Sequence, residues 1–303
     1  MKRLVYCCLP AVYVLCCAGF VHAEGSLEKI SDHVYAYAGA KNPSAANSFG
    51  ANAGIVMGDK GILVVDTLGS AKEAGRFIED IRKISDKPIR YVVDTHNHFD
   101  HTFGNTEFAA IGAAIFAQSS CPSNMRKKAP QVLKNPKSYG MSDEQAKAVR
   151  ITYPDVTAPE MMRIDLGSVS VDILFLAPSH TDDSVLVFVP QDRVLFSGDV
   201  LFTDYYPFMG DGDMNGWVKT LDFIMTVRID KIVPGHGPVS TKKDIADMKQ
   251  YLLAFDRKAK ELSAKSGDLD TMVAELKKSL PVRTWGDFLI KDSLQAKYLQ
   301  AKN

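Results

Sequence analysis

The chain has 303 residues, 46% of them hydrophobic, and its 36 basic and 36 acidic side chains give a formal net charge of zero. A neutral chain without a basic stripe or interleaved aromatic and basic residues excludes a nucleic-acid-binding protein. No internal repeat or low-complexity tract is visible, so we expect the chain after its N-terminal leader to fold as one unit around a large core.

The N-terminus has the pattern of a secretory signal peptide. Met1-Lys2-Arg3 is basic, residues 4–20 are almost wholly apolar, and Val21-His22-Ala23 resembles a small-residue cleavage site. An uncleaved membrane anchor is the alternative, because the apolar run is close to the shortest that spans a bilayer. The cleavage-like ending favours removal. We therefore predict a signal peptide at 1–23, a periplasmic or secreted protein, and no stable membrane insertion after cleavage.

The cysteines also distinguish the leader from the rest of the chain. Four of the five lie in the leader, and Cys121 is the only one after it. No intramolecular disulfide can form in the cleaved protein, which must gain its stability from its core and from bound metal. We expect Cys121 to be an ordinary thiol in the core or at the surface.

The first half of the cleaved chain has the pattern of short strands and one amphipathic helix. Apolar and β-branched runs separated by Gly, Asn and Asp predict the strands. Ser70 begins a segment with apolar residues at helical spacing, which predicts a helix over 70–85. The polar stretch 41–50 is expected to be a mobile loop. The predicted strands of this half are 33–38, 53–58, 62–67 and 89–95.

The second half alternates strands and helices and ends in helices alone. Residues 122–160 carry several lysines and prolines, and we expect a polar insertion of helices and loops there. Gln191-Asp192 is expected to form a hairpin turn. We predict one domain over 24–240 and a C-terminal helical extension over 241–303 packed on it. The predicted strands are 168–176, 184–190, 193–197 and 231–234, and the predicted helices are 215–228, 242–266, 269–280 and 287–301.

Three histidines and an aspartate follow the predicted strand 89–95 within six residues, in the run His96-Asn97-His98-Phe99-Asp100-His101. Imidazole and carboxylate groups are the ligands that Zn²⁺ prefers, and they also bind iron or manganese. A polar, histidine-rich loop is the alternative. Because the chain has only seven histidines, this clustering favours a metal site.

The remaining candidate ligands lie near the ends of later strands. His180 and His236 each follow an apolar run, and Asp199 lies just beyond another. His96 and His98 can reach one ion from an extended loop, whereas Asp100 and His101 turn toward a second metal position. Two ions about 3.5 to 4 Å apart need a bridging ligand, and Asp199 is the strongest candidate.

These motifs, in this order, resemble the metallo-β-lactamase superfamily over residues 28–240. The resemblance implies an α/β fold, a four-layer αβ/βα sandwich with the metals at one edge between two sheets. It also implies two metal positions that share one aspartate. His96, His98 and His180 are then the ligands of the first ion, Asp100, His101 and His236 those of the second, and Asp199 binds both.

Within the superfamily, the ligand set resembles the hydroxyacylglutathione hydrolases more than the antibiotic-degrading enzymes. One β-lactamase subclass has a cysteine ligand near the position of Asp199, whereas Cys121 falls in a different region. The glutathione-binding helical domain of those thioesterases is not recognisable in the tail after residue 240. The electron-transferring diiron branch typically carries a glutamate where His98 stands.

The resemblance implies a metal-dependent hydrolase that acts on a small molecule. Two zinc ions lower the pKa of a bridging water, and the resulting hydroxide attacks a thioester, lactone, lactam or phosphoester. We assign Asp100 a catalytic role in orienting the hydroxide, and Tyr206 a role as donor to the developing oxyanion. Asn47–Asn52 is a candidate lid, and Asp182 and Asp183 are candidates for orienting ligand histidines.

Three alternatives remain open at this point. Persulfide dioxygenases of the same superfamily use one iron held by two histidines and an aspartate, and the full set of seven ligands favours the hydrolase over them. A β-lactamase is the second alternative. The third is a metal-free binding protein on the same fold, which is expected to have lost ligands, and none is missing here. The motifs do not determine the oligomeric state.

Overall fold

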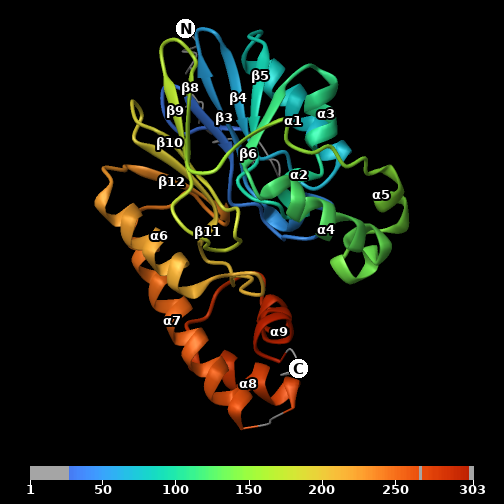
Figure 1. Ribbon diagram of the computed structural model, residues 1–303, viewed down its shortest axis with the longest axis vertical. Coiled ribbons are helices and arrows are strands. Elements are labelled where there is room, and N and C mark those ends of the chain that lie inside the picture. The colour runs from blue at the N-terminus through green and yellow to red at the C-terminus, as the bar shows by residue number, and fades with distance from the viewer. Residues whose placement is uncertain (1–26, 266–267, 300–303) are drawn as a thin grey trace, which may run out of the picture.

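The computed structural model describes residues 27–265 and 268–299, so the predicted signal peptide lies outside the described residues. Two β-sheets lie at the centre of the molecule (Figure 1). Seven strands form the first sheet in chain order: β1 (Glu28–Lys29), β2 (Val34–Tyr37), β3 (Ala53–Gly58), β4 (Gly61–Val65), β5 (Ile89–Val93), β6 (Ala114–Gln118) and β7 (Val156–Ala158). Five strands form the second, in the order β12 (Lys231–His236), β11 (Val194–Phe202), β10 (Leu186–Val189), β9 (Ser170–Leu174) and β8 (Met161–Asp165).

Helices cover the outer face of each sheet. α1 (Ala71–Ile84) and α3 (Asn105–Ala110) pack on the seven-stranded sheet, and α6 (Met214–Thr226) and α7 (Lys242–Ala264) pack on the five-stranded sheet (Figure 1). One apolar core fills the space between the sheets, and a further core lies between each sheet and its helices. The predicted α/β fold, a four-layer αβ/βα sandwich with C-terminal helices, is confirmed.

The local sequence explains why α1 forms and where the histidine cluster begins. Ser70 caps the helix, because its side chain accepts a hydrogen bond from the Glu73 N–H at 3.3 Å. The crossover through α1 lets β5 pair in parallel with β4, so the cluster starts at the carboxyl end of β5. The apolar face that packs on the sheet consists of Ala74, Phe77, Ile78 and Ile81.

The predicted mobile loop between β2 and β3 contains a short 3-10 helix, η1 (Ala45–Gly50). Ser48 and Phe49 have left-handed φ angles of 51° and 54°. The Ser48 hydroxyl donates to Glu73 Oε1 at 2.8 Å and accepts from the Gly69 N–H at 2.7 Å. These contacts join the segment to the start of α1.

The expected polar insertion at 122–160 is wrong in part. It supplies most of α4 (Cys121–Lys134) and β7, which is the edge strand of the seven-stranded sheet. The sequence also did not indicate β6 and β8, which flank this segment. The strands β6, β7 and β8 have only three to five residues, which is too short for a clear alternating pattern. The polar remainder forms η2 (Pro136–Tyr139) and α5 (Asp143–Ala148).

The strand expected at 193–197 is longer than predicted. β11 has nine residues, all of them buried, because its parallel pairing with β12 continues to the pair formed by Phe202 and His236. Asp199 therefore lies inside a strand and not just after one. Gly235 on β12 makes room for its carboxylate, since a Cβ there would stand 1.9 Å from Asp199 Oδ1.

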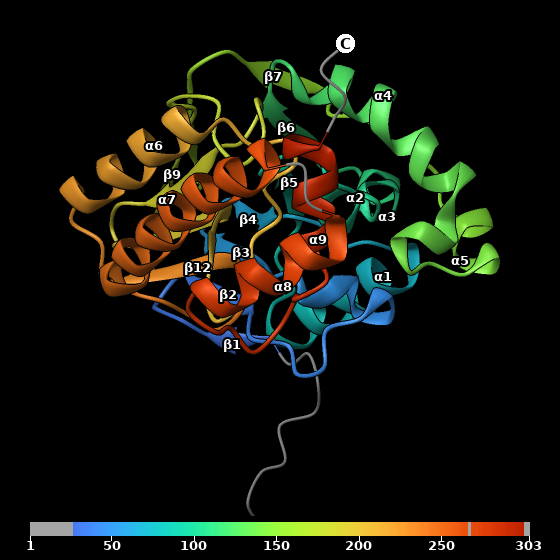
Figure 2. The same cartoon turned by 90° about the horizontal axis from the view of Figure 1, so that it is seen from below.

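The C-terminal helices pack against the second sheet. α8 (Leu269–Ser279) and α9 (Leu289–Ser293) lie below the sheets in Figure 1 and therefore in front of them in the view from below (Figure 2). They share one apolar core with α6, α7, β11 and β12. The helix predicted over 287–301 begins at Leu289 as α9 and continues into the π-helical turn η3 (Leu294–Tyr298), and residues 300 and 301 of the prediction lie outside the described residues. None of the described helices is long and apolar enough to cross a membrane.

Candidate metal centre

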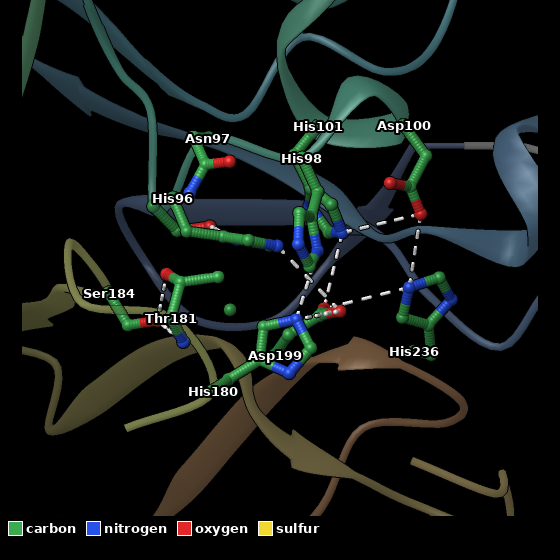
Figure 3. A network of polar contacts seen from close by, with 12 residues as sticks. His96, Asn97, His98, Asp100, His101, His180, Thr181, Ser184, Asp199 and His236 are labelled. Carbon is green, nitrogen blue, oxygen red and sulfur yellow. Dashed lines mark hydrogen bonds and ion pairs between the residues drawn. The ribbon is translucent and has the colours of Figure 1, made fainter. Parts of the chain in front are cut away.

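The structure brings all seven predicted metal ligands together at one edge of the two sheets (Figure 3). The first histidines of the cluster follow β5, and the short helix α2 (Phe99–Thr102) turns the last two ligands of the cluster toward the same place. The others come from the loop after β9, from the middle of β11 and from the end of β12. The seven side chains are His96, His98, Asp100, His101, His180, Asp199 and His236.

The ligand atoms form two groups on either side of Asp199. Its Oδ2 lies 3.4 Å from His180 Nε2 and 3.8 Å from His96 Nε2. Its Oδ1 lies 3.2 Å from His101 Nε2 and 3.6 Å from His236 Nε2. One carboxylate therefore faces both groups, as a bridge between two ions requires. The first group is His96, His98, His180 and Asp199, and the second is Asp100, His101 and His236.

Unpartnered buried atoms indicate that this set of side chains fits bound metal. His96 Nε2, His101 Nε2 and Asp199 Oδ1 have no hydrogen-bond partner among the described residues, although all three atoms are buried. Each unpaired buried polar group costs about 1 to 3 kcal/mol. Imidazole nitrogens and carboxylate oxygens that converge in this way suit a borderline divalent ion.

Comparison with known proteins agrees with this geometry. A family model described as the metallo-beta-lactamase superfamily matches residues 47–236, which is more than half of the chain. The chain belongs to the metallo-beta-lactamase superfamily. The predicted family is therefore confirmed, and curated members of this family include metal-dependent hydrolases.

Two curated members of the superfamily illustrate the range of relatives. A linear primary-alkylsulfatase from a Pseudomonas species is 26% identical over 227 residues, which cover 64% of this chain and 43% of that protein. A metallo-beta-lactamase type 2 from Elizabethkingia meningoseptica is 22% identical and covers 78% of this chain and 88% of that protein. The chain thus spans less than half the length of the alkylsulfatase.

Solved structures of the superfamily show the same fold. A metallo-beta-lactamase from Pontibacter korlensis has a TM-score of 0.62 at 19% identity, covering 76% of this chain and 99% of that one. An inverting sec-alkylsulfatase from a Pseudomonas species has a TM-score of 0.67 at 18% identity, covering 91% of this chain and 50% of that one. At these identities the likeness concerns the fold.

Two aspartates that the sequence analysis missed orient ligand histidines. Asp66, directly after β4, accepts a hydrogen bond from His101 Nδ1 at 2.9 Å. Asp211 accepts one from His98 Nε2 at 2.8 Å and one from Lys128 Nζ at 2.7 Å. Each bond directs the other ring nitrogen toward the ligand group. A polar residue directly after a buried strand was a usable signal for Asp66, whereas nothing in the sequence links Asp211 to His98.

Asp183 joins the two loops that carry the first ligand group. Its Oδ1 accepts hydrogen bonds from Asn97 Nδ2 at 2.9 Å and from Thr181 Oγ1 at 2.6 Å, and its Oδ2 accepts one from Asn124 Nδ2 at 3.0 Å. Asn97 lies between two ligands, and Thr181 follows another. Of the two predicted orienting aspartates, Asp183 is fully buried at this junction and Asp182 is exposed.

Replacing Asp183 by alanine is expected to lower the free energy of unfolding by about 3 kcal/mol or more, because three buried hydrogen bonds to its carboxylate are lost. Thermal unfolding of the metal-free protein measures this effect without a contribution from bound ions. Asp165→Ala is the control, since Asp165 pairs with Lys60 at an exposed position and its loss should leave the free energy of unfolding nearly unchanged. Equal losses in both variants would contradict the structural role of Asp183.

Cys121 lies next to this junction and is a buried free thiol. Burial, and then the nearby Asp183 carboxylate, raises the pKa of the Cys121 thiol well above its usual value. A thiol held protonated in the core is unreactive. Of the two predicted places for this ordinary thiol, the core and the surface, the structure shows the core.

The electrostatics of the site keep the first group ready to bind a cation. Burial lowers the pKa of His180 to about 3 and that of His96 well below its usual value, so both rings are neutral. Burial opposes ionisation of Asp199, but the surrounding histidines outweigh it and hold its pKa well below the usual range. Burial likewise opposes protonation of His236, yet the Asp199 carboxylate raises its pKa to about 9.

The two tyrosines after β11 occupy different positions. Tyr206, the predicted oxyanion donor, packs its ring 6.1 Å from that of Tyr251 on α7. Its neighbour Tyr205 packs instead against His236, with ring centroids 4.9 Å apart. The catalytic role of Tyr206 stays a prediction, and Tyr205, which the sequence analysis did not single out, is the tyrosine in contact with a ligand.

Proposed function

We propose that the protein is an exported, dinuclear zinc hydrolase acting on a small ester or related substrate. The position of Asp199 between two ligand groups carries this proposal, because it offers one shared carboxylate to two ions. Two divalent ions, when bound, supply a hydroxide nucleophile at neutral pH and polarise the scissile carbonyl or phosphoryl oxygen. The second ligand group, Asp100, His101 and His236, offers a place for a second ion. It therefore favours this activity over a persulfide dioxygenase, which needs only one iron.

Solvent reaches the ligand set mainly on one side. The side chains of His98 and Asp100 are 17% and 12% exposed, whereas those of the other five ligands are at most 5% exposed. We therefore assign substrate entry to this side. Asp100 Oδ2, 3.4 Å from His236 Nε2, is the carboxylate oxygen suited to orient the attacking water and to accept its proton.

Aromatic rings flank the exposed side. The Phe208 ring lies 5.9 Å from that of His98, and the Phe49 ring lies 6.0 Å from that of Phe99, which stands between His98 and Asp100 in the chain. Such surfaces favour a substrate with an apolar group beside the scissile bond. The named relatives, an alkylsulfatase and a β-lactamase, add sulfate esters to the thioesters, lactones, lactams and phosphoesters considered above.

Metal analysis followed by a substrate panel tests the proposed function. We expect two zinc ions per chain and hydrolysis of at least one substrate among alkyl esters of sulfate and phosphate, thioesters, lactones and a β-lactam, with full loss on chelation. One iron per chain, with oxygen uptake on a persulfide, would establish the dioxygenase instead. Preference for the β-lactam over every other substrate would identify a β-lactamase.

Export is tested separately by cell fractionation of the full chain. We expect the protein in the periplasm or the medium, with a mature N-terminus at Glu24 after removal of residues 1–23. Retention in the membrane fraction with an intact N-terminus would show that the leader is an anchor.

A further inference from the structure

The segment before α9 contacts residues 204–206, which follow β11, close to the second ligand group. The Tyr206 N–H donates to the Trp285 carbonyl at 2.8 Å, and the Thr284 N–H donates to the Asp204 carbonyl at 3.2 Å. Gly286, at φ 80°, lies directly against the Tyr205 ring, since a Cβ there would stand 2.2 Å from Tyr205 Cε1. Residues 284–288 of the C-terminal extension therefore hold Tyr205 in place by contacting its ring and the backbone on either side of it.

Tyr205 and His236 bind the same backbone oxygen. The Tyr205 hydroxyl donates to the Phe49 carbonyl at 3.0 Å, and His236 Nδ1 donates to it at 3.2 Å. The Phe49 ring also lies 6.2 Å from that of Phe288. Three distant parts of the chain, namely η1, the residues after β11 and the C-terminal extension, thus meet at Phe49.

This carbonyl fixes the orientation of His236. When Nδ1 carries the proton and donates it to Phe49, the lone pair of Nε2 faces the carboxylates of Asp100 and Asp199, at 3.4 and 3.6 Å. The left-handed backbone at Phe49 costs about 1 to 3 kcal/mol and persists only when its surroundings hold it. Tyr205 and Phe288 are two of the groups that hold it.

We infer that residues 284–288 of the C-terminal extension, acting through Tyr205 and the Phe49 carbonyl, position His236 and so control the affinity of the second metal site. The inference rests on the proposed two-metal function. Tyr205 is a positioning residue, because it acts through Phe49 and His236. The hydrogen bond of the Tyr205 hydroxyl goes to Phe49 and not to the first ligand group. The Phe202 ring packs against the rings of both Tyr205 and His180, but this packing does not need the hydroxyl, so the first ion should keep its affinity in Tyr205→Phe.

Competition between the protein and a zinc chelator tests the inference, because it measures the affinity of each ion without any substrate. In Tyr205→Phe, we expect the second zinc ion to bind about 10-fold or more weakly and the first to keep its affinity, as loss of an outer partner typically costs 10 to 100-fold. Gly286→Ala should weaken binding of the second zinc ion even more than Tyr205→Phe does. Absorption of the cobalt-substituted protein should show selective loss of the second site.

Tyr298→Phe is the matched control, since it removes another tyrosine hydroxyl of the extension, bonded to Asp256 at 2.8 Å. The affinities for both zinc ions should be the same in this variant as in the wild type. The unchanged first site also reports that Tyr205→Phe is folded. If the wild-type protein binds two ions and Tyr205→Phe retains or loses both equally, the inference fails and the proposed function stands. If the wild-type protein binds one ion, both fail.

Discussion

Asp199→Ala is expected to weaken both metal sites together and to lower the hydrolysis rate by about 1000-fold or more, because a bound ion is what brings the pKa of water from 15.7 to about 7. The two oxygens of this carboxylate face different ligand groups, at 3.2 Å from His101 Nε2 and 3.4 Å from His180 Nε2. No other ligand side chain lies against both groups in this way among the described residues. Metal stoichiometry after dialysis and steady-state kinetics measure the two effects.

Asp199→Asn is the informative partner variant. Asparagine keeps the shape of the side chain and one carbonyl oxygen but loses the negative charge that two cations share. We therefore expect this variant to retain one ion and to have a hydrolysis rate between those of the wild type and the alanine variant. Asp165→Asn, at an exposed position of the same sheet, should change neither quantity. If Asp199→Ala kept two ions at wild-type affinity, the bridging position of Asp199 would be refuted.

Removal of bound metal is expected to abolish hydrolysis and to lower the melting temperature. Within the described part of the chain, the metal-free site leaves buried nitrogen and oxygen atoms without hydrogen-bond partners, including His96 Nε2 and Asp199 Oδ1. A ligand present at 100 times its Kd adds about 2.7 kcal/mol of stability, which corresponds to about 4 to 5 °C for a chain of this size. Thermal scans of the chelated and the zinc-loaded protein give the shift directly.

The choice of ion added back supplies the control for this experiment. Zinc should restore both the melting temperature and the activity. Calcium and magnesium should restore neither, since these ions take oxygen ligands and five of the seven ligands here are imidazoles. A melting temperature that did not depend on zinc would contradict occupancy of the site by this metal.

The candidate ligands could be predicted from the sequence because their chemistry is local and their residue types are scarce. His96, His98 and His101 stand within six positions directly after an apolar strand, and only seven histidines exist in the chain. The strands around them are also encoded locally, since the predicted 53–58 matches β3 and the predicted helix over 70–85 matches α1 within one residue at each end.

Other parts of the fold lacked such a local signal. β7 has three residues and gains its place from pairing with β6, which the sequence does not reveal. The full length of β11 likewise depends on its parallel partner β12. Short strands are stabilised by their neighbours more than by their own pattern, so their boundaries follow from the assembled sheet.

The candidate metal-binding side chains could be read from the amino-acid sequence, because ligand chemistry belongs to residue types and to their placement after strands. The contacts that hold these side chains in place became visible only in the folded chain. Asp211 reaches His98 across 113 positions of the chain, and Tyr205 reaches Phe49 across 156. Hydrogen bonds of this kind depend on distances set by the packing of two sheets and a C-terminal extension, and no periodicity or spacing in the sequence records them.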